Sequence, residues 1–350
     1  MGAAKASINH PSTWESFGRL DDYFAQVAKD LEHDPKPEPS LDGLPDERIK
    51  WEAKSRQDAD KILETVTGRV SEREIFIPCR DGHKTRGLLY RSGQDSVGGR
   101  PLFVVLHGGG FLFGSAEMES PLCIRAALEF GCVALSLEYR LAPEHRFPQA
   151  HEDVWDALQW LTSNPASIGA DLTKGFILGG CSAGGHITIP LSHRARDKKL
   201  SPPLTGIYLS ITPALAHQAV PEKYRPLYRS REQFRDGISL DLASILLYDK
   251  ASEPDVFSPL WSPLLWPTGH ANLPPAYFQI CGADMLRDEA LIYERELRLN
   301  DIETKVDIYP GLPHVFWYTH PDHPAVPKYH EDAKNGIGWL LDRKCSSGGL

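Results

Sequence analysis

The sequence lacks the features that identify several large classes of protein. Its six cysteines form no C-x-x-C pair and most lie in apolar runs, so we expect buried free thiols in a reducing compartment rather than disulfides or a zinc site. No run of 18 apolar residues and no apolar N-terminal signal segment occurs, which argues against stable membrane insertion and favours the cytoplasm. The formal net charge of -9 argues against nucleic-acid binding, which requires clustered lysine and arginine.

The N-terminal fifth of the chain is expected to be helical. In segment 12–31, apolar residues recur every three or four positions, as on one face of a helix. Ser12, with Glu15 three residues later, is typical of a capping box at a helix N-terminus. The proline-rich stretch 34–40 then breaks this helix, and a second one is predicted at about 46–66.

The remainder of the chain alternates between short apolar runs and helical segments. From Pro101 onward this alternation indicates βαβ units on a mainly parallel sheet. Only the stretch 213–254 fits the alternation poorly, and we expect it to lie over the sheet together with the N-terminal helices. The runs expected to be strands are EREIFIPC, KTRGLLYR, PLFVVL, CVALSLEYR, GFILGG, LTGIYLSI, PAYFQICG and TKVDIYPG.

The stretch GGCSAGG, residues 179–185, follows one of these predicted strands and precedes a helical segment. A nucleophilic serine in an α/β sheet needs a sharp turn from strand to helix, with glycines two residues on either side that let the two elements approach closely. Ser182 meets this requirement. The same pattern also fits a plain glycine-rich turn, so the interpretation needs support from elsewhere in the chain.

Support comes from LHGGGFLFGS, residues 106–115. Three consecutive glycines after a buried strand can direct backbone N–H groups outward. We expect the amides of Gly108 and Gly109, with that of Ala183 after the serine, to form an oxyanion hole, in which one donor typically lowers the barrier by about 3 kcal/mol. A phosphate-binding loop is the alternative, but its G-x-x-x-x-G-K-[ST] motif is absent.

A base and an orienting acid would complete a catalytic triad. Asp284 and His314 each follow a predicted strand, where α/β sheets present their chemistry, and the order Ser, Asp, His fits this arrangement. His314 would accept the proton of Ser182, and Asp284 would orient the imidazole. The competing base is His186, which has no obvious acid partner. The competing acid is Asp288, which we expect to cap the following helix.

Together, the motifs HGGGF, YRLAPEHRFPQAHEDVWDALQWL, GCSAGG, DMLRDEA and LPHVF resemble the hormone-sensitive-lipase-type branch of the α/β-hydrolases, the family IV esterases. The resemblance runs from about 75 to 342. It implies an α/β-hydrolase fold, with a mostly parallel eight-stranded sheet flanked by helices and a helical cap. It divides the chain into a catalytic core at 69–212 and 255–350 and a cap at 1–68 and 213–254. The segment EYRLAPEHRFP is expected to be a structural signature behind the site rather than a catalytic element.

The resemblance also implies a function. Members hydrolyse esters with short to medium acyl groups through an acyl-enzyme intermediate, without a metal or cofactor. The expected partner is a small-molecule ester or acylated metabolite, and because relatives often pair through an edge strand, a homodimer is one expected oligomer. The alternatives are an amide hydrolase, a lactonase or an acyltransferase acting on a small biosynthetic metabolite, or a non-catalytic ligand-binding member, against which the presence of His314 argues.

The chain departs from the family pattern at three positions. Cys181 stands where Asp usually precedes the nucleophile, His186 where Asn is common, and Val315 where Gly usually follows the histidine. At such a turn the preceding side chain points away from the serine, so we expect Cys181 to be a packed, poorly reactive thiol. A second nucleophile or an oxidation-sensitive switch are the competing interpretations.

Aromatic residues of the predicted cap are expected to roof the substrate pocket. They would limit its depth, while each buried CH₂ of an acyl chain gains about 0.8 kcal/mol, which together predict an optimum at roughly two to six acyl carbons. The residues concerned are Trp14, Phe17, Tyr23, Phe24, Tyr224, Tyr228, Phe234 and Tyr248.

Overall fold

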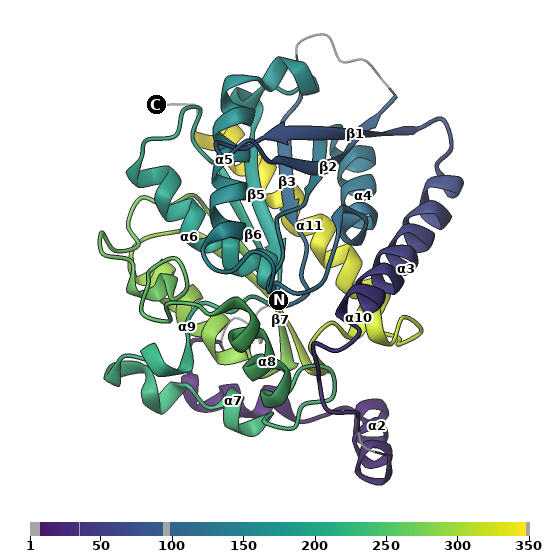
Figure 1. Cartoon of the computed structure of the whole chain (residues 1–350). Coiled ribbons are helices and arrows are strands. Elements are labelled where there is room, and N and C mark those ends of the chain that lie inside the picture. Colours follow the sequence, from purple (N-terminus) through teal and green to yellow (C-terminus); the bar gives the residue numbers. More distant parts are fainter. Residues whose placement is uncertain (1–7, 35, 94–98, 348–350) are drawn as a thin grey trace.

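The computed structural model describes residues 8–34, 36–93 and 99–347 and is built around one eight-stranded sheet (Figure 1). The strand order is β1-β2-β4-β3-β5-β6-β7-β8, and only β2 runs antiparallel to its neighbours. The predicted eight-stranded, mostly parallel sheet is therefore confirmed. The strands are β1 (Val70–Pro78), β2 (Lys84–Ser92), β3 (Leu102–Leu106), β4 (Val133–Leu137), β5 (Phe176–Cys181), β6 (Gly206–Ser210), β7 (Ala276–Ala283) and β8 (Thr304–Pro313).

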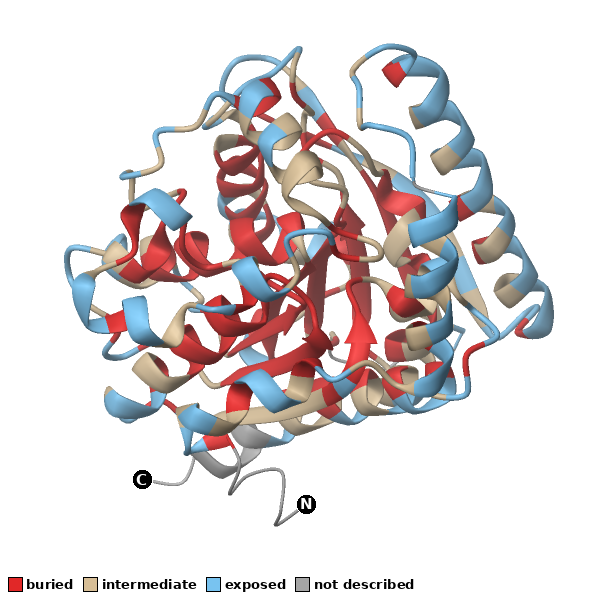
Figure 2. Ribbon diagram, turned by 90° about the horizontal axis from the view of Figure 1, so that it is seen from below, coloured by how far each residue is buried: buried red, intermediate tan, exposed pale blue. Residues whose placement is uncertain are grey.

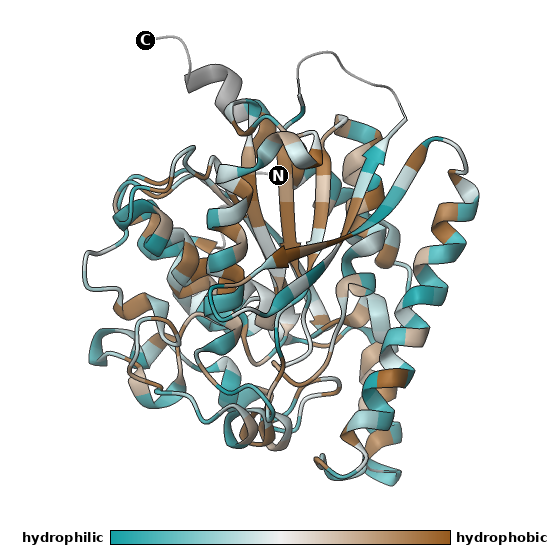
Figure 3. Cartoon of the chain, turned by 45° about the horizontal axis from the view of Figure 1, so that its top comes forward, coloured by the Kyte–Doolittle hydropathy of each residue, from teal (hydrophilic) through white to brown (hydrophobic). Residues whose placement is uncertain are grey.

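Helices cover both faces of this sheet because its central strands are apolar on both sides. In β3, Leu102 and Val104 belong to the core under α5, α6 and α9, whereas Phe103 and Val105 belong to the core under α4 and α11. This alternation follows from the period of two in a strand. Figure 3 shows the central strands as strongly hydrophobic, and Figure 2 shows that they are buried. The flanking helices are α4 (Ser120–Phe130), α5 (Gln149–Ser163), α6 (Ala183–Asp197), α9 (Arg287–Leu299) and α11 (Val326–Ser347).

The N-terminal segment contains two helices where one was predicted. A 3₁₀ helix, η1 (Pro11–Gly18), is followed by an extended turn and then by α2 (Asp22–His33). Asp21 caps α2 by accepting a hydrogen bond from the amide of Phe24 at 2.9 Å. The predicted capping box at Ser12 is wrong, because η1 starts without a side-chain cap.

Packing against the sheet explains this break. The chain crosses the ends of β7 and β8 so closely that a Cβ on Gly282 would lie 2.2 Å from the carbonyl oxygen of Phe17, and one on Gly311 would lie 2.6 Å from that of Arg19. These tertiary contacts fix an extended backbone at Arg19, where helical periodicity alone favours continuation. Local propensity is overridden here by packing.

The second predicted helix is confirmed as α3 (Leu44–Thr65). It packs beside α4 and beside the short 3₁₀ helix η2 (Ala116–Glu119) that precedes α4 (Figure 1). Arg48 ties α3 to the loop after β3, because its Nε donates to the carbonyl oxygen of Leu112 at 2.7 Å and its Nη2 donates to that of Ala142.

The stretch 213–254 forms short helices below the carboxyl ends of the strands, with α7 lying against η1 (Figure 1). That it acts as a cap stays a prediction. In the described part of the chain, no helix is both long enough and apolar enough to traverse a bilayer. The remaining helices are η3 (Pro165–Ile168), η4 (Leu172–Lys174), η5 (His217–Ala219), η6 (Glu222–Leu227), α7 (Ser230–Gln233), α8 (Leu242–Ser252), η7 (Pro263–Leu265) and α10 (Phe316–Thr319).

Candidate active site

Ser182 occupies a sharp turn between β5 and α6. Its φ of 50° lies in the left-handed region, which is uncommon for any residue but glycine. A Cβ on Gly180 would lie 2.2 Å from the carbonyl carbon of Gly184, and a Cβ on Gly184 would lie 2.1 Å from the carbonyl oxygen of Leu106. The two glycines therefore allow a turn that no larger residue could make, and this turn presents the Ser182 hydroxyl above the sheet.

A continuous hydrogen-bonded chain links Ser182 to the loops after β7 and β8. The Oγ of Ser182 lies 3.1 Å from Nε2 of His314, and Nδ1 of His314 lies 2.6 Å from Oδ2 of Asp284. The other carboxylate oxygen of Asp284 accepts from the amide of Leu286 at 2.9 Å, which fixes the carboxylate. The structure thus brings the three predicted triad residues together.

The competing acid, Asp288, lies elsewhere. Its Oδ2 accepts from the amides of Arg229 at 2.8 Å and Ser230 at 2.7 Å, while Oδ1 accepts from Nε of Arg287 at 2.8 Å. The expectation that Asp288 caps its own helix is wrong, because it is the second residue of α9 and instead caps the start of α7.

The competing base, His186, faces away from the triad acid. Its Nε2 donates to the carbonyl oxygen of Trp261 at 2.6 Å. Burial lowers the pKa of His186 to about 4, so the ring is neutral near pH 7. This histidine forms part of a pocket wall and has no acidic hydrogen-bond partner among the described residues.

The glycine loop after β3 lies directly against the serine turn. A Cβ on Gly108 would be 3.3 Å from the carbonyl oxygen of Cys181, and Gly109 has a φ of 106° with no room for a side chain beside Phe113. The amides of Gly108 and Gly109 donate to no described residue. Ala183 is the first residue of α6, where amides have no partner within the helix.

His107 shapes this loop. Its Nδ1 donates to the carbonyl oxygen of Gly108 at 2.8 Å, and its ring stacks on Tyr139 with centroids 4.3 Å apart. The hydroxyl of Tyr139 donates to the carbonyl oxygen of His107 at 2.8 Å. Burial lowers the pKa of His107 to about 4, which keeps this packed ring neutral.

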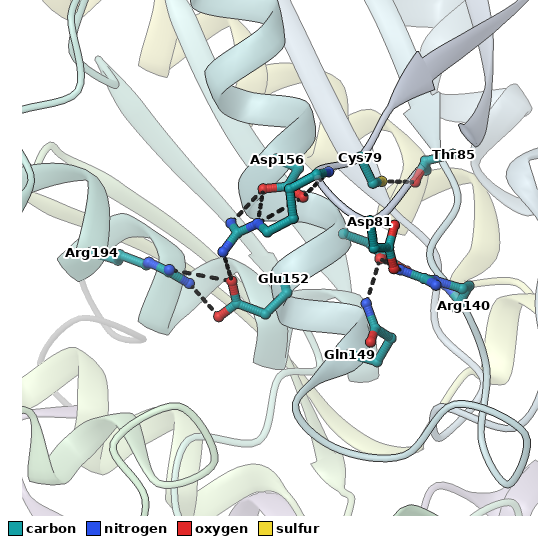
Figure 4. Close-up of polar contacts among 10 residues, drawn as sticks. Cys79, Asp81, Thr85, Arg140, Gln149, Glu152, Asp156 and Arg194 are labelled. Carbon is teal, nitrogen blue, oxygen red and sulfur yellow. Dashed lines mark hydrogen bonds and ion pairs between the residues drawn. The ribbon is translucent and has the colours of Figure 1, made fainter. Parts of the chain in front are cut away.

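Ion pairs connect the segment that contains YRLAPEH to α5 and to the β1–β2 turn (Figure 4). The Nε of Arg140 donates to both carboxylate oxygens of Asp153, at 3.1 and 3.0 Å, and its Nη2 lies 2.7 Å from Asp81 in the β1–β2 turn. On the same helix, α5, Glu152 pairs with Arg194 of α6 at 2.7 Å. These contacts agree with a structural role for the segment.

Cys181 packs in a cluster with Ile211 and Tyr329 and is only 8% exposed. Burial raises the pKa of the Cys181 thiol well above its usual range, so the reactive thiolate is disfavoured. The residue nevertheless forms part of a cavity wall next to Ser182.

Two cavities of unequal size meet at Ser182. The smaller has a volume of about 70 Å³ and the larger about 390 Å³. Both are lined by Ser182, Gly110, Leu240 and Tyr248. The smaller is further lined by Phe111, Ala183, His186, Leu215, Ile245 and Trp261. The larger is further lined by Trp51, Glu119, Leu122, Cys181, Tyr208, His314 and Trp317.

The predicted aromatic roof is largely wrong. Of its eight residues only Tyr248 lines either cavity, whereas Trp14, for example, is buried in the core and Tyr228 donates to Glu289 at 2.9 Å. Apart from Tyr248, the aromatic residues that line the larger cavity were missed, among them Trp51 of α3. The signal that could have revealed Trp51 is its spacing of three or four residues from later positions of the same helix, which places those side chains on one helix face.

Residues 103–318 match the family described as alpha/beta hydrolase fold. The chain belongs to this family. It is 36% identical over 330 residues to the AB hydrolase superfamily protein B1A11.02 of Schizosaccharomyces pombe, with 94% of this chain and 96% of that protein covered. It is 34% identical to the versiconal hemiacetal acetate esterase of Dothistroma septosporum, with 75% and 79% covered.

Solved structures agree with this membership. The crystal structure of vibralactone cyclase superposes with a TM-score of 0.85 at 31% identity, covering 94% of this chain and 97% of that chain. The predicted relation to the hormone-sensitive-lipase-type esterases is confirmed. The chain is a hydrolase of the carboxylesterase type.

Proposed function

We propose that the chain hydrolyses carboxylic esters with a short acyl group and a larger alcohol group, through an acyl-enzyme intermediate on Ser182. The observation that carries this proposal is the hydrogen-bonded chain from Ser182 through His314 to Asp284, placed where a cavity of about 70 Å³ meets one of about 390 Å³.

In the first step the Oγ of Ser182 forms a bond to the ester carbonyl carbon, and its proton moves to Nε2 of His314. The Nδ1–H of the imidazolium donates to Asp284, whose carboxylate stabilises the positive charge. The negative charge on the former carbonyl oxygen is held by the amides of Gly108, Gly109 and Ala183. When the tetrahedral intermediate collapses, Nε2 of His314 gives its proton to the alcohol oxygen, which leaves.

The position of His314 supports an assignment of the two cavities. The leaving oxygen has to come within hydrogen-bond reach of Nε2 of His314, and this residue lines the larger cavity but not the smaller. The alcohol group therefore occupies the larger cavity and the acyl group the smaller. Water then attacks the acyl-enzyme with His314 as the base, and the carboxylic acid is released.

Titration with a serine-directed phosphonate, followed by a panel of p-nitrophenyl esters of increasing acyl length, tests this function. Stoichiometric labelling of Ser182 and an optimum at short acyl groups are expected. Absence of both labelling and hydrolysis would instead favour a non-catalytic ligand-binding protein.

The similarity to vibralactone cyclase favours a second candidate, in which a hydroxyl group rather than water resolves the acyl-enzyme. The triad chemistry is the same, because either acceptor loses its proton to His314. Product analysis separates the two: hydrolysis yields the free acid, whereas transfer within the acyl chain yields a lactone.

A further inference from the structure

The larger cavity is apolar over much of its wall but contains one acid without a partner. Glu119, the last residue of η2, lines this cavity and is partly exposed, and its carboxyl group makes no hydrogen bond or ion pair with any described residue. The two other acids in the wall are paired: Glu117 lies 2.6 Å from Arg86, and Asp58 lies 2.9 Å from Lys54. Glu119 is thus the acid in this wall that remains available to a ligand.

No cation near Glu119 favours its ionised form. Burial raises the pKa of Glu119 to about 8, so the carboxyl group is largely protonated near pH 7 unless a ligand supplies a positive charge. Arg125 also lines the cavity, but the acid that acts on its pKa is Glu331 of α11. A desolvated carboxyl group without a hydrogen-bond partner is costly to the folded state. A ligand that supplies a hydrogen-bond donor would relieve this cost.

A second unpartnered polar group lies in the same wall. Ser55 of α3 is 3% exposed, lines the cavity, and its hydroxyl has no hydrogen-bond partner in the described chain. Because α3 packs against η2, Ser55 and Glu119 come from neighbouring elements. The hydroxyl can rotate, so it can donate to a ligand or accept from one.

The carboxyl group of Glu119 also lies near Cys181, since it contributes to the raised pKa of that thiol. The family resemblance leads us to expect an acid at residue 181, directly before the nucleophile. This chain has a thiol there and places a carboxyl group on η2 instead. A carboxyl group is therefore present near residue 181, in the wall of the larger cavity.

We propose that Glu119, with Ser55, selects the leaving group: a bulky, largely apolar alcohol that carries a hydrogen-bond donor, either a hydroxyl or an ammonium group. The inference rests on the proposed function, because it assigns the alcohol to the larger cavity. Apolar side chains such as Leu122 and Trp317 contact the body of the alcohol, and the donor meets the carboxyl group.

Three acetates that differ at one substituent test the proposal: the esters of p-methylbenzyl, p-hydroxymethylbenzyl and p-aminomethylbenzyl alcohol. In the wild type, kcat/KM for each donor-bearing ester is expected to exceed that of the methyl ester by about 3- to 10-fold, the range of one net hydrogen bond. Glu119→Leu should make kcat/KM equal for all three esters. Glu119→Gln, nearly the same in shape, should keep the preference for the hydroxymethyl ester and lose the preference for the aminomethyl ester. Ser55→Ala should reduce the preference for the hydroxymethyl ester.

Glu129→Gln is the matched control, because Glu129 is an exposed acid on α4, the helix that directly follows η2, and it should leave the three ratios unchanged. Phosphonate labelling of Ser182 in every variant checks the fold and the nucleophile. Equal kcat/KM values for the three acetates in the wild type, or unchanged ratios in Glu119→Leu, would overturn the proposal; if that variant does not fold, an unchanged aminomethyl ratio in Glu119→Gln would do so. Failure of the proposed function is distinguishable, since neither labelling nor hydrolysis of any ester would then be seen.

Discussion

The two cavities that meet at Ser182 differ in size and are bounded by different elements of the fold. The smaller is bounded by α6 and by the stretch 213–254 after β6, and both of its acids lie under the influence of one cation: Arg231 lies 2.7 Å from Glu289, and its charge opposes the rise that burial causes in the pKa of Asp249. The larger is bounded by α3, η2 and the loop that carries His314, and it contains the unpartnered Glu119. One covering segment therefore shapes the smaller cavity, which we propose holds the acyl group, and the other shapes the larger cavity, which we propose holds the alcohol and which contains an acid without a partner.

The largest effect is expected from variants that remove a triad residue at the junction of the two cavities. Ser182→Ala and His314→Ala should each lower kcat by about 10⁵- to 10⁶-fold for every ester, because triad members act as a unit. Single-turnover hydrolysis measures the loss, and circular dichroism checks that the fold is retained. If either variant kept near-wild-type turnover with any acyl or alcohol group, the common mechanism would be wrong.

The next effect concerns the glycine loop after β3, which we propose forms the oxyanion hole and which lies in the wall of the larger cavity. Gly109→Ala should lower kcat by about 10²- to 10³-fold, because the added Cβ would lie 2.3 Å from the carbonyl oxygen of Phe113 and displace the donor amides. Gly131→Ala is the matched control: this glycine also has a positive φ, of 60°, but has no atom within 4 Å of the added Cβ. It should lower the melting temperature and leave kcat unchanged; an equal loss of kcat in both variants would contradict the assignment.

A pair of variants tests whether the two cavities bind different parts of the ester. Ile245→Ala enlarges the smaller cavity and should shift the acyl-length profile by about fourfold per added methylene, with the alcohol held constant. Trp51→Ala enlarges the larger cavity and should change the preference among alcohols with the acyl group held constant. Steady-state kinetics on both ester series measure the two profiles. A shift of the acyl profile in Trp51→Ala would show that the assignment is reversed.

The smallest effect is expected at Cys181. Cys181→Ala should change kcat/KM by less than about threefold, because the thiol is packed and its thiolate form is disfavoured. Iodoacetamide should leave turnover of the wild type largely intact over an hour. Rapid inactivation with modification mapped to Cys181 would instead support a redox-sensitive switch.

The sequence was most informative where chemistry and local geometry coincide. The Gly180 to Gly184 motif predicts its own turn, because the required close contacts exclude larger residues, and the positions of Asp284 and His314 follow from the ends of their strands. The break before α2 could not be predicted, since it depends on the ends of β7 and β8, far away in the chain. The wall of the larger cavity could not be predicted for the same reason, because Trp51 and Glu119 come to line one cavity only in the folded protein.

The left-handed backbone of Ser182 sets a limit on how far this protein can be stabilised. A non-glycine residue in that conformation costs on the order of 1 kcal/mol of folding free energy. Glycine would relieve this strain, and glycine has no hydroxyl with which to attack an ester. Improvement of stability and retention of turnover are therefore incompatible at position 182. Substitutions that raise the stability of this protein have to lie at other positions, such as exposed helix surfaces and loops.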